Sequence, residues 1–192
     1  MVIGVLALQG GVREHAEMLR ALGAQAILAR KPNDLDNLDG VVIPGGESST
    51  IDRLMRIFGL ADPLTEALRG GLPVLGTCAG LITLATEIED PAPGQKSLGI
   101  VDMRVRRNAF GRQVDSAVET IVTRYGAVRA AYIRAPEVVS VGGDAEVIAV
   151  TSERIVGVET PSALAVSFHP ELTGDTTIHE RFLSKVRGTV DA

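Results

Sequence analysis

One cysteine in the chain has the surroundings of a nucleophile. Cys78 is the only cysteine among 192 residues, and it lies in Gly76-Thr77-Cys78-Ala79-Gly80, between the apolar run 73–75 and an apolar helical pattern. A strand, a Gly-x-Cys-x-Gly turn and a helix form a nucleophile elbow, whose glycines let the strained turn form and a substrate approach. A lone free cysteine is also often a small buried apolar residue. The motif alone therefore leaves both interpretations open.

A histidine suited to activate this thiol follows another apolar run. His169 lies in Ser167-Phe168-His169-Pro170-Glu171, directly after residues 163–166. A cysteine nucleophile needs a base, and the base needs an acceptor that orients its ring. Glu171 projects to the same side as His169 if the backbone is extended. We therefore predict a triad of Cys78, His169 and Glu171, the alternative being that His169 is a satisfied surface histidine.

The other two histidines are expected to be solvated. His15 falls on the polar or boundary face of the first predicted helix, and His179 stands beside Glu180 and Arg181 in the last one. Both are weaker candidates than His169 for the base.

A glycine turn follows a third apolar run, at residues 40–43. It reads Pro44-Gly45-Gly46-Glu47-Ser48-Ser49-Thr50 and leads into a helical pattern. Backbone N–H groups at adjacent glycines can donate to a developing oxyanion, and one such donor is worth about 3 kcal/mol. We expect one donor at Gly45 and the second at Ala79, by analogy with the elbow. The same turn can also cap a helix through Ser48 or Ser49.

The elements that must position these residues alternate along the first half of the chain. Apolar runs predict strands at residues 2–8, 24–29, 40–43 and 73–75. Helical patterns lie between and after them, at residues 12–22, 51–57, 63–68 and from 81 onward, and residues 31–39 are expected to be a loop. This alternation predicts an α/β fold of three layers, a mostly parallel central sheet with helices on both faces. Active sites of such sheets gather at the carboxyl ends of the strands.

The second half of the chain predicts an antiparallel edge on the same sheet. Short β-type runs occupy residues 98–105, 116–123, 128–133, 138–141, 146–150, 155–159 and 163–166. Residues 86–97 are expected to form a polar surface connection, and residues 176–186 a closing helix. No domain boundary interrupts the pattern, so we predict a single domain over residues 1–192.

Composition and charge argue against several classes of protein. Hydrophobic residues make up 45% of the chain, which is enough for a packed core, and the net charge of −5 disfavours a nucleic-acid binder. The basic run Arg104, Arg106 and Arg107, with Arg112 nearby, is typical of a solvated strand face. A single cysteine excludes an internal disulfide and a zinc cluster of cysteines. Without an apolar run long enough to span a bilayer, a cytoplasmic protein with no membrane or nucleic-acid partner is expected.

Taken together, these segments resemble a known family. They are Leu8-Gln9-Gly10, the turn 44–50, the elbow 76–82, Arg107-Asn108-Ala109-Phe110-Gly111-Arg112-Gln113, Ile133-Arg134-Ala135-Pro136 and residues 167–172. The cysteine elbow with a downstream His-Pro-Glu is typical of class I glutamine amidotransferases. Residues 44–48, 107–113 and 133–136 resemble, more narrowly, the glutaminase subunits of pyridoxal 5'-phosphate synthase in vitamin B6 biosynthesis.

The resemblance implies a reaction and a substrate. Cys78 would attack the side-chain amide of glutamine, His169 would transfer the proton, and Glu171 would orient His169. Ammonia would then leave, and water would hydrolyse the glutamyl thioester. The glutamine contacts that the resemblance implies are Gly46, Glu47, Ser48, Arg107, Ile133 and Arg134. Gln9 would help to transfer or gate ammonia.

The resemblance also implies a partner. In the family, ammonia passes to a (β/α)8-barrel synthase subunit that builds pyridoxal 5'-phosphate, and the glutaminase is poorly active until docked. No cofactor or metal is expected in this chain. Two alternatives stay open: a glutaminase of another pathway or a cysteine hydrolase on the same fold, and a non-catalytic regulatory subunit, which would usually have lost the nucleophile or the base.

Overall fold

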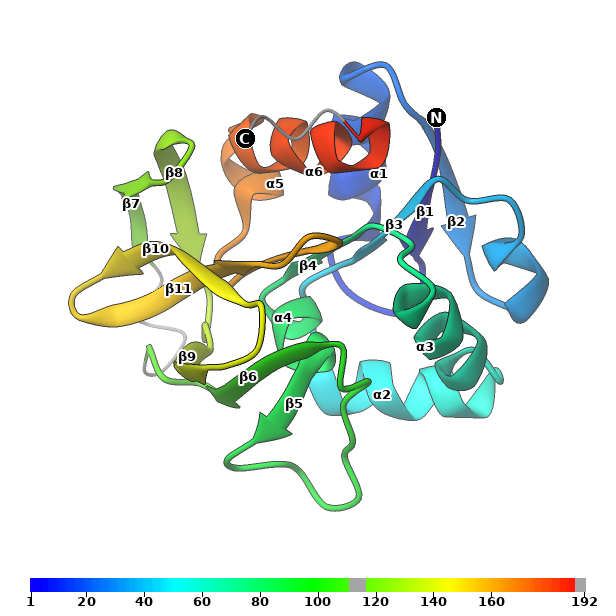
Figure 1. The fold of residues 1–192 in the computed structure, drawn as a ribbon, viewed down its shortest axis with the longest axis horizontal. Coiled ribbons are helices and arrows are strands. Elements are labelled where there is room, and N and C mark those ends of the chain that lie inside the picture. The colour runs from blue at the N-terminus through cyan, green and yellow to red at the C-terminus, as the bar shows by residue number, and fades with distance from the viewer. Residues whose placement is uncertain (111–116, 189–192) are drawn as a thin grey trace.

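A single sheet runs through the part of the chain that the computed structural model describes, residues 1–110 and 117–188 (Figure 1). Its parallel portion has the order β2-β1-β3-β4-β12. These strands span Gln25–Ala29, Val2–Leu6, Gly40–Ile43, Val74–Thr77 and Ala163–Val166, in that order. Four of the five follow predicted apolar runs of the first half, and β12 comes from the far end of the chain to complete the parallel core.

The sheet continues past β12 as antiparallel strands, in the order β11-β10-β7-β8. β9 pairs with both β11 and β6, and β5 pairs with β6. The bounds of β5 to β11 are Ala85–Ile88, Val101–Arg106, Ala117–Thr123, Gly126–Tyr132, Glu137–Val141, Glu146–Thr151 and Arg154–Glu159. The predicted α/β fold with a mostly parallel sheet and an antiparallel edge is confirmed.

Helices cover the two faces of the parallel strands (Figure 1). One face carries α1 (Val12–Ala21), α5 (Pro170–Thr173) and α6 (Thr177–Arg187). The other face carries α2 (Ser48–Ile57), α3 (Ala61–Arg69) and α4 (Ala79–Leu84). The residues of β3 are apolar throughout because helices cover both faces of this strand. Its Val42 packs into the core under α1 and α6, while Val41 and Ile43 pack into the core under α2 to α4.

Two local expectations need correction, and a third is not tested. The expected connection at residues 86–97 begins inside a strand, because β5 pairs with β6 and Thr86 donates a hydrogen bond to the Met103 carbonyl. The loop expected at residues 31–39 contains a short 3-10 helix at Pro32–Leu35. Ser116, with which we expected a strand to begin, lies outside the described residues, as do Gly111, Arg112 and Gln113.

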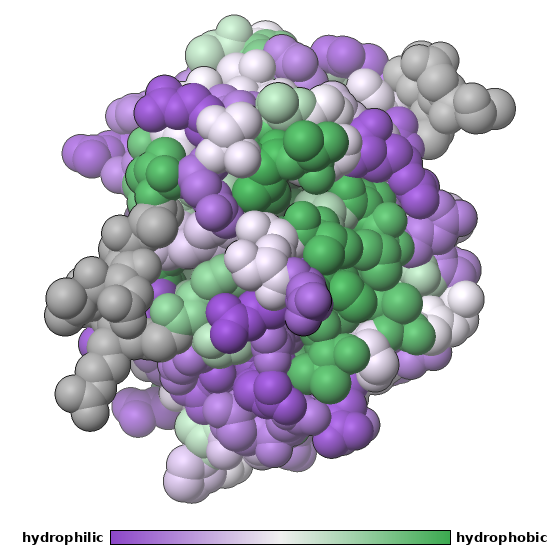
Figure 2. Space-filling view, turned by 90° about the vertical axis from the view of Figure 1, so that its left-hand side faces the viewer, coloured by the Kyte–Doolittle hydropathy of each residue, from purple (hydrophilic) through white to green (hydrophobic). Residues whose placement is uncertain are grey.

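The antiparallel side of the molecule presents apolar side chains to solvent (Figure 2). Val118 and Val122 of β7 and Val150 of β10 are all more than half exposed. A gathering of this kind is typical of surfaces that pack against another molecule. No helix within the described ranges is long and apolar enough to cross a membrane.

Candidate active site

Two strand ends bring the cysteine and the histidine together. β4 and β12 are parallel neighbours, and Thr77 is paired in register with Val166. The N–H of Cys78 continues this ladder by donating to the Val166 carbonyl at 2.8 Å. His169 follows β12 three residues later, and its own N–H donates to the Ala131 carbonyl of β8 at 2.9 Å. The expectation that both segments meet at the carboxyl edge of the sheet is confirmed.

The elbow holds Cys78 in a strained backbone. Its φ of 49° and ψ of −102° lie on the positive-φ side, which residues with a Cβ rarely adopt. Such a conformation costs about 1–3 kcal/mol and persists only where the surroundings enforce it. The turn is tight because Gly80 lies directly against the Ile43 carbonyl of β3, where a Cβ would clash. Cys78 therefore enters α4 with its Sγ in the cleft, 3.9 Å from the Ile133 carbonyl oxygen.

His169 and Glu171 form a buried pair. His169 Nδ1 lies 2.7 Å from Glu171 Oε1, and the Glu171 side chain is 0% exposed. The expected extended backbone between them is wrong. His169 is the N-cap of α5 and Glu171 lies in its first turn, because Pro170 provides the fixed φ that favours the first helical position. The turn still brings both side chains into contact.

His169 and Glu171 each stabilise the charged form of the other. Burial alone would lower the pKa of His169, but hydrogen bonds with Cys78 and Glu171, together with their charges, raise that pKa to about 10. Burial would raise the pKa of Glu171, yet the hydrogen bond from His169 and the nearby rings lower it. These contacts thus favour a protonated His169 ring between the Cys78 sulfur and the Glu171 carboxylate, which is an arrangement that suits an activated cysteine nucleophile.

The glycine turn packs directly on these two side chains. A Cβ at Gly45 would clash with the His169 ring and would lie 3.2 Å from the Cys78 Cβ. The Gly45 N–H donates to Thr77 Oγ1 at 3.0 Å, so in this structure it is not directed at an oxyanion as we expected. Thr77 competes for this donor because its hydroxyl is buried and must be satisfied. The Ala79 N–H stands at the start of α4, where no intrahelical acceptor exists.

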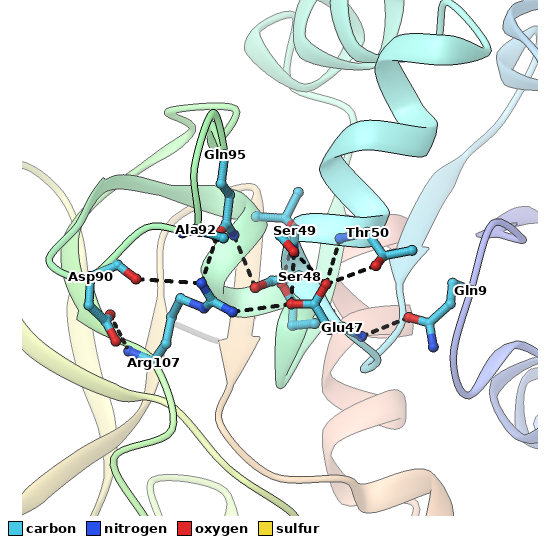
Figure 3. A network of polar contacts seen from close by, with 11 residues as sticks. Gln9, Glu47, Ser48, Ser49, Thr50, Asp90, Ala92, Gln95 and Arg107 are labelled. Carbon is cyan, nitrogen blue, oxygen red and sulfur yellow. Dashed lines mark hydrogen bonds and ion pairs between the residues drawn. The ribbon is translucent and has the colours of Figure 1, made fainter.

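The same turn ends in a helix cap of an unexpected kind. The expected caps Ser48 and Ser49 are wrong, since α2 starts at Ser48 and its N-cap is Glu47. The Glu47 carboxylate accepts hydrogen bonds from the N–H and hydroxyl groups of Ser49 and Thr50 (Figure 3). These donors outweigh the effect of burial and lower the pKa of Glu47 to about 2. The longer glutamate side chain reaches the donor groups of both Ser49 and Thr50, which explains why Glu47 and not a serine caps the helix.

A polar network links this cap to Arg107 (Figure 3). Arg107 donates to Glu47 Oε1 at 3.1 Å and to Gln95 Oε1 at 3.0 Å. Gln95 in turn donates from Nε2 to Ser48 Oγ at 3.0 Å. Sequence reasoning missed Gln95, because it lies in a polar stretch rich in proline and glycine. Arg104 and Arg106, by contrast, lie on the exposed face of β6 and pair with carboxylates there, as expected.

A cleft of about 530 Å³ opens beside these groups. Its lining includes the three triad residues, Gly45 and all the expected substrate contacts, namely Gly46, Glu47, Ser48, Arg107, Ile133 and Arg134. Gln9 is exposed outside this lining, and its Oε1 accepts the Glu47 N–H at 2.7 Å. Within residues 1–110 and 117–188, no cluster of histidine, cysteine or acidic side chains is placed to hold a metal ion. The cleft thus has the size and the polar lining that suit a small polar molecule, and Cys78 lies in its wall.

The expectation that His15 and His179 are solvated is wrong. Both rings are completely buried, and they contact each other through His15 Nδ1 and His179 Nε2 at 2.9 Å. The reason lies in their helices. His15 shares the apolar stripe of α1 with Ala16 and Leu19, and α6 turns His179 inward with its own apolar residues. The spacing to buried neighbours three and four residues away was the signal in the sequence.

The folded protein is expected to lose stability as the pH falls below about 6.5. Burial lowers the pKa of His15 and lowers that of His179 to about 3, so both stay neutral when folded. Unfolded histidines, with a pKa near 6.5, take up protons in this range. Because the unfolded state binds more protons, the free energy of unfolding falls by up to about 1.4 kcal/mol per pH unit for each ring.

Urea unfolding at about pH 7.5, 6.5 and 5.5 measures this effect. Glu47 and Glu171, whose pKa values are lowered, stay ionised across this interval and do not contribute. The raised pKa of His169 acts in the other direction. The stabilisation that His169 gives to the folded state is complete below about pH 6.5 and is lost as the pH rises through about 10. A free energy of unfolding that stays constant between pH 6.5 and 5.5 would contradict a neutral buried pair.

Comparison with known proteins finds similarity over nearly the whole chain. The sequence profile of the SNO glutamine amidotransferase family matches residues 5–188. A pyridoxal 5'-phosphate synthase subunit PdxT of Mycobacteroides abscessus is 54% identical over 188 residues, which cover 97% of each chain. The protein of the same name from Streptomyces avermitilis is 54% identical over 189 residues, covering 97% of this chain and 94% of that one.

Solved structures agree with the sequence relatives. A crystal structure of a glutamine amidotransferase superposes with a TM-score of 0.91 at 43% identity, covering 97% of this chain and 100% of that one. A chain of the PurLQS structure from Thermotoga maritima superposes with a TM-score of 0.64 at 16% identity, covering 98% of this chain and 95% of that one. The latter likeness shows the fold alone.

Proposed function

The chain belongs to the SNO glutamine amidotransferase family and is a glutaminase that supplies ammonia for pyridoxal 5'-phosphate synthesis, and we propose that Cys78 is its nucleophile. One observation carries this assignment. A cysteine on a strained elbow shares one cleft with a buried His169–Glu171 pair whose nitrogen and oxygen are 2.7 Å apart. A cysteine that merely filled the core would need neither the strain nor the ion pair.

The first half of the reaction forms a thioester. The Cys78 thiolate attacks the side-chain carbonyl carbon of glutamine, and the carbonyl oxygen becomes an oxyanion. His169, held by Glu171, then gives its proton to the amide nitrogen. The carbon–nitrogen bond breaks, ammonia leaves and a glutamyl thioester remains on Cys78. In the second half, His169 takes a proton from water, the resulting hydroxide attacks the thioester, and the thiolate returns as glutamate departs.

Two backbone N–H groups are the proposed oxyanion donors. The Ala79 N–H directly follows the nucleophile, as in other elbows. For the second donor we now favour Gly46 over Gly45. The Gly45 carbonyl accepts from the Gly11 N–H at 3.1 Å, so the Gly46 N–H, on the opposite side of the trans peptide, points away from Gly11. Removing one such donor typically costs about 10²–10³-fold in kcat.

The charged ends of glutamine have matching groups in the cleft. Arg107 and Arg134 offer guanidinium groups for the α-carboxylate, and carbonyl or carboxylate oxygens at Ile133 and Glu47 suit the α-ammonium group. Gly46 and Ser48 complete the proposed contacts. Gln9, held against the Glu47 N–H, is proposed to help transfer or gate ammonia.

Replacing Gln95 with leucine is expected to raise the KM for glutamine about tenfold while kcat changes little. Gln95 fixes both Arg107 and Ser48 without touching the reacting atoms, and a loss of binding that is equal in the ground and transition states raises KM alone. Steady-state kinetics measure the split. Gln25→Leu, at an exposed position of β2, is the matched control. An unchanged KM in the Gln95 variant would show that this network does not position the substrate contacts.

We further propose that the partner is a (β/α)8-barrel synthase subunit. The support is that relatives 54% identical over nearly their full length are named as pyridoxal 5'-phosphate synthase subunits.

One sheet with strands from both halves of the chain supports a single glutaminase domain over residues 1–192. The cytoplasm is the proposed location, because a lone cysteine kept as a thiol suits a reducing compartment.

A reconstitution experiment tests this function. The purified chain is mixed with the matching synthase subunit, its sugar phosphate substrates and glutamine, and both glutamate and pyridoxal 5'-phosphate are measured. We expect the two products to form together and each to require both proteins. Glutamate release that responds equally to an unrelated ammonia acceptor would favour a glutaminase of another pathway.

A further inference from the structure

A second polar cluster lies behind the catalytic pair and takes no part in the steps described for Cys78. His15 of α1 and His179 of α6 come from opposite ends of the chain, and both are fully buried. His15 Nδ1 lies 2.9 Å from His179 Nε2, and His15 Nε2 lies 3.0 Å from Thr77 Oγ1. Burying four polar nitrogens is costly unless they are hydrogen-bonded. Such a cluster therefore needs an explanation.

His15 stands between two parts of the active centre. Its Nε2 is 3.4 Å from Glu171 Oε2, the oxygen that His169 does not use. Within the described residues, that buried oxygen makes no hydrogen bond. Through Thr77, whose hydroxyl also accepts the Gly45 N–H at 3.0 Å, the same His15 nitrogen reaches the glycine turn at residues 44–47.

Counting protons selects one arrangement of the two rings. Only one hydrogen fits between His15 Nδ1 and His179 Nε2. If His15 donated it, the neutral His15 ring would turn a lone pair toward the Glu171 carboxylate, and the His179 Nδ1–H would be a buried donor without a partner. If His179 donates, His15 Nε2–H faces Thr77 and Glu171, and only an acceptor is left unpaired. A buried N–H without a partner is the rarer and costlier of the two cases.

We propose that His15, held in one tautomer by His179, is a positioning residue of the glutaminase centre whose Nε2–H fixes Glu171 and Thr77 together. The proposal rests on the proposed function of the triad, and it adds residues behind the triad that hold Glu171 in position. The carboxylate that orients the base and the hydroxyl that anchors the glycine turn would then share one donor. Such outer partners are what hold a reacting group within the narrow geometry that catalysis requires.

The proposal predicts how the pH profile changes when the donor is lost. Without the His15 N–H, the Glu171 carboxylate is free to turn away from His169, and the hydrogen bond that helps to raise the pKa of His169 weakens. The basic limb of kcat/KM, where the imidazolium loses its proton, then moves to lower pH. The charged groups that face His15 are Glu171, His169 and Glu14, and Asp175 also faces His179.

Two substitutions at His15 separate hydrogen bonding from packing. In His15→Gln the amide nitrogen takes the place of Nε2 and keeps the donor, whereas His15→Phe keeps a ring and removes it. Assayed with the synthase subunit, the phenylalanine variant is expected to lose about 10²-fold in kcat, with little change in KM and a basic limb at lower pH. The glutamine variant is expected to keep most of the wild-type kcat and the wild-type limb.

Matched controls keep the test decisive. Lys185 is also in α6, and Lys185→Met breaks its buried ion pair with Glu159 of β11. This variant should have a lower melting temperature and an unchanged basic limb of kcat/KM. If His15→Phe does not fold, His179→Leu takes its place, with an expected loss of about tenfold in kcat and the same direction of shift. A wild-type kcat and limb, or equal losses in the glutamine and phenylalanine variants with an unmoved limb, would overturn the proposal.

The outcome is separable from the proposed function. Cys78→Ala is assayed alongside these variants under the same conditions. If that variant still released glutamate, the function assigned to Cys78 would fail. If it is inactive while His15→Phe behaves as wild type, only the role of His15 fails.

Discussion

Replacing Cys78 with alanine is expected to abolish glutamate release, with a loss in kcat of about 10⁴-fold or more. The variant keeps the cleft and the His169–Glu171 pair but has no atom that can form the thioester. Because the side chain is small and 5% exposed, alanine should fit the elbow without disturbing the fold. Glutamate formation from glutamine, measured with the synthase subunit present, is the readout.

The synthase provides the control for this variant. Ammonium salt bypasses the glutaminase, so a complex containing Cys78→Ala should still make pyridoxal 5'-phosphate when ammonium is supplied. This rescue shows that the synthase in the mixture is active, and co-elution of the variant with the synthase shows that the variant is folded and docked. Glutamate release by Cys78→Ala at more than about a hundredth of the wild-type rate would rule out a thioester at this position.

Replacing Glu171 with glutamine is expected to lower kcat by about 10⁴-fold, the effect typical of neutralising the residue that orients a catalytic histidine. The substitution keeps the size of the side chain, yet an amide cannot hold the imidazolium of His169 as a carboxylate does 2.7 Å away. The pKa of His169 should fall as well, since the charge and hydrogen bond of Glu171 help to raise it. The basic limb of kcat/KM should therefore move to lower pH.

Glu159→Gln is the matched control for this second variant. Glu159 is the other buried glutamate with ionic partners, Arg181 and Lys185, and it belongs to β11 and not to the cleft. Its neutralisation should cost stability while kcat stays near the wild-type value. If Glu171→Gln kept kcat within about tenfold of wild type, the residue would not be the orienting acceptor of a triad.

The elbow and the fold were predictable because their signals are local. Gly76 and Gly80 around Cys78, and the apolar runs that precede Cys78 and His169, specify strand ends through a few neighbouring residues. Parallel pairing then brings those ends to one edge of the sheet. The same reasoning places residues 44–47 beside Cys78, as the register of β3 and β4 shows.

The parts that escaped prediction depend on partners far along the chain. His15 lies among charged neighbours, and one hydrogen bond that its buried ring makes involves His179, 164 residues away. Gln95 contacts Ser48 across 47 residues, and nothing in its polar surroundings marks it. Glu47 was not the expected cap because cap preferences favour shorter side chains, and here a carboxylate reaches the N–H groups of both Ser49 and Thr50.

Labelling with an electrophilic analogue of glutamine tests whether Cys78 is the nucleophile. The complex with the synthase subunit is treated with an analogue that carries an alkylating group in place of the carboxamide, and the digested chain is analysed by mass spectrometry. We expect one adduct per chain, on Cys78, whose formation is blocked by excess glutamine and parallels the loss of glutaminase activity. Inactivation with Cys78 unmodified, or with the adduct on another residue, would contradict it.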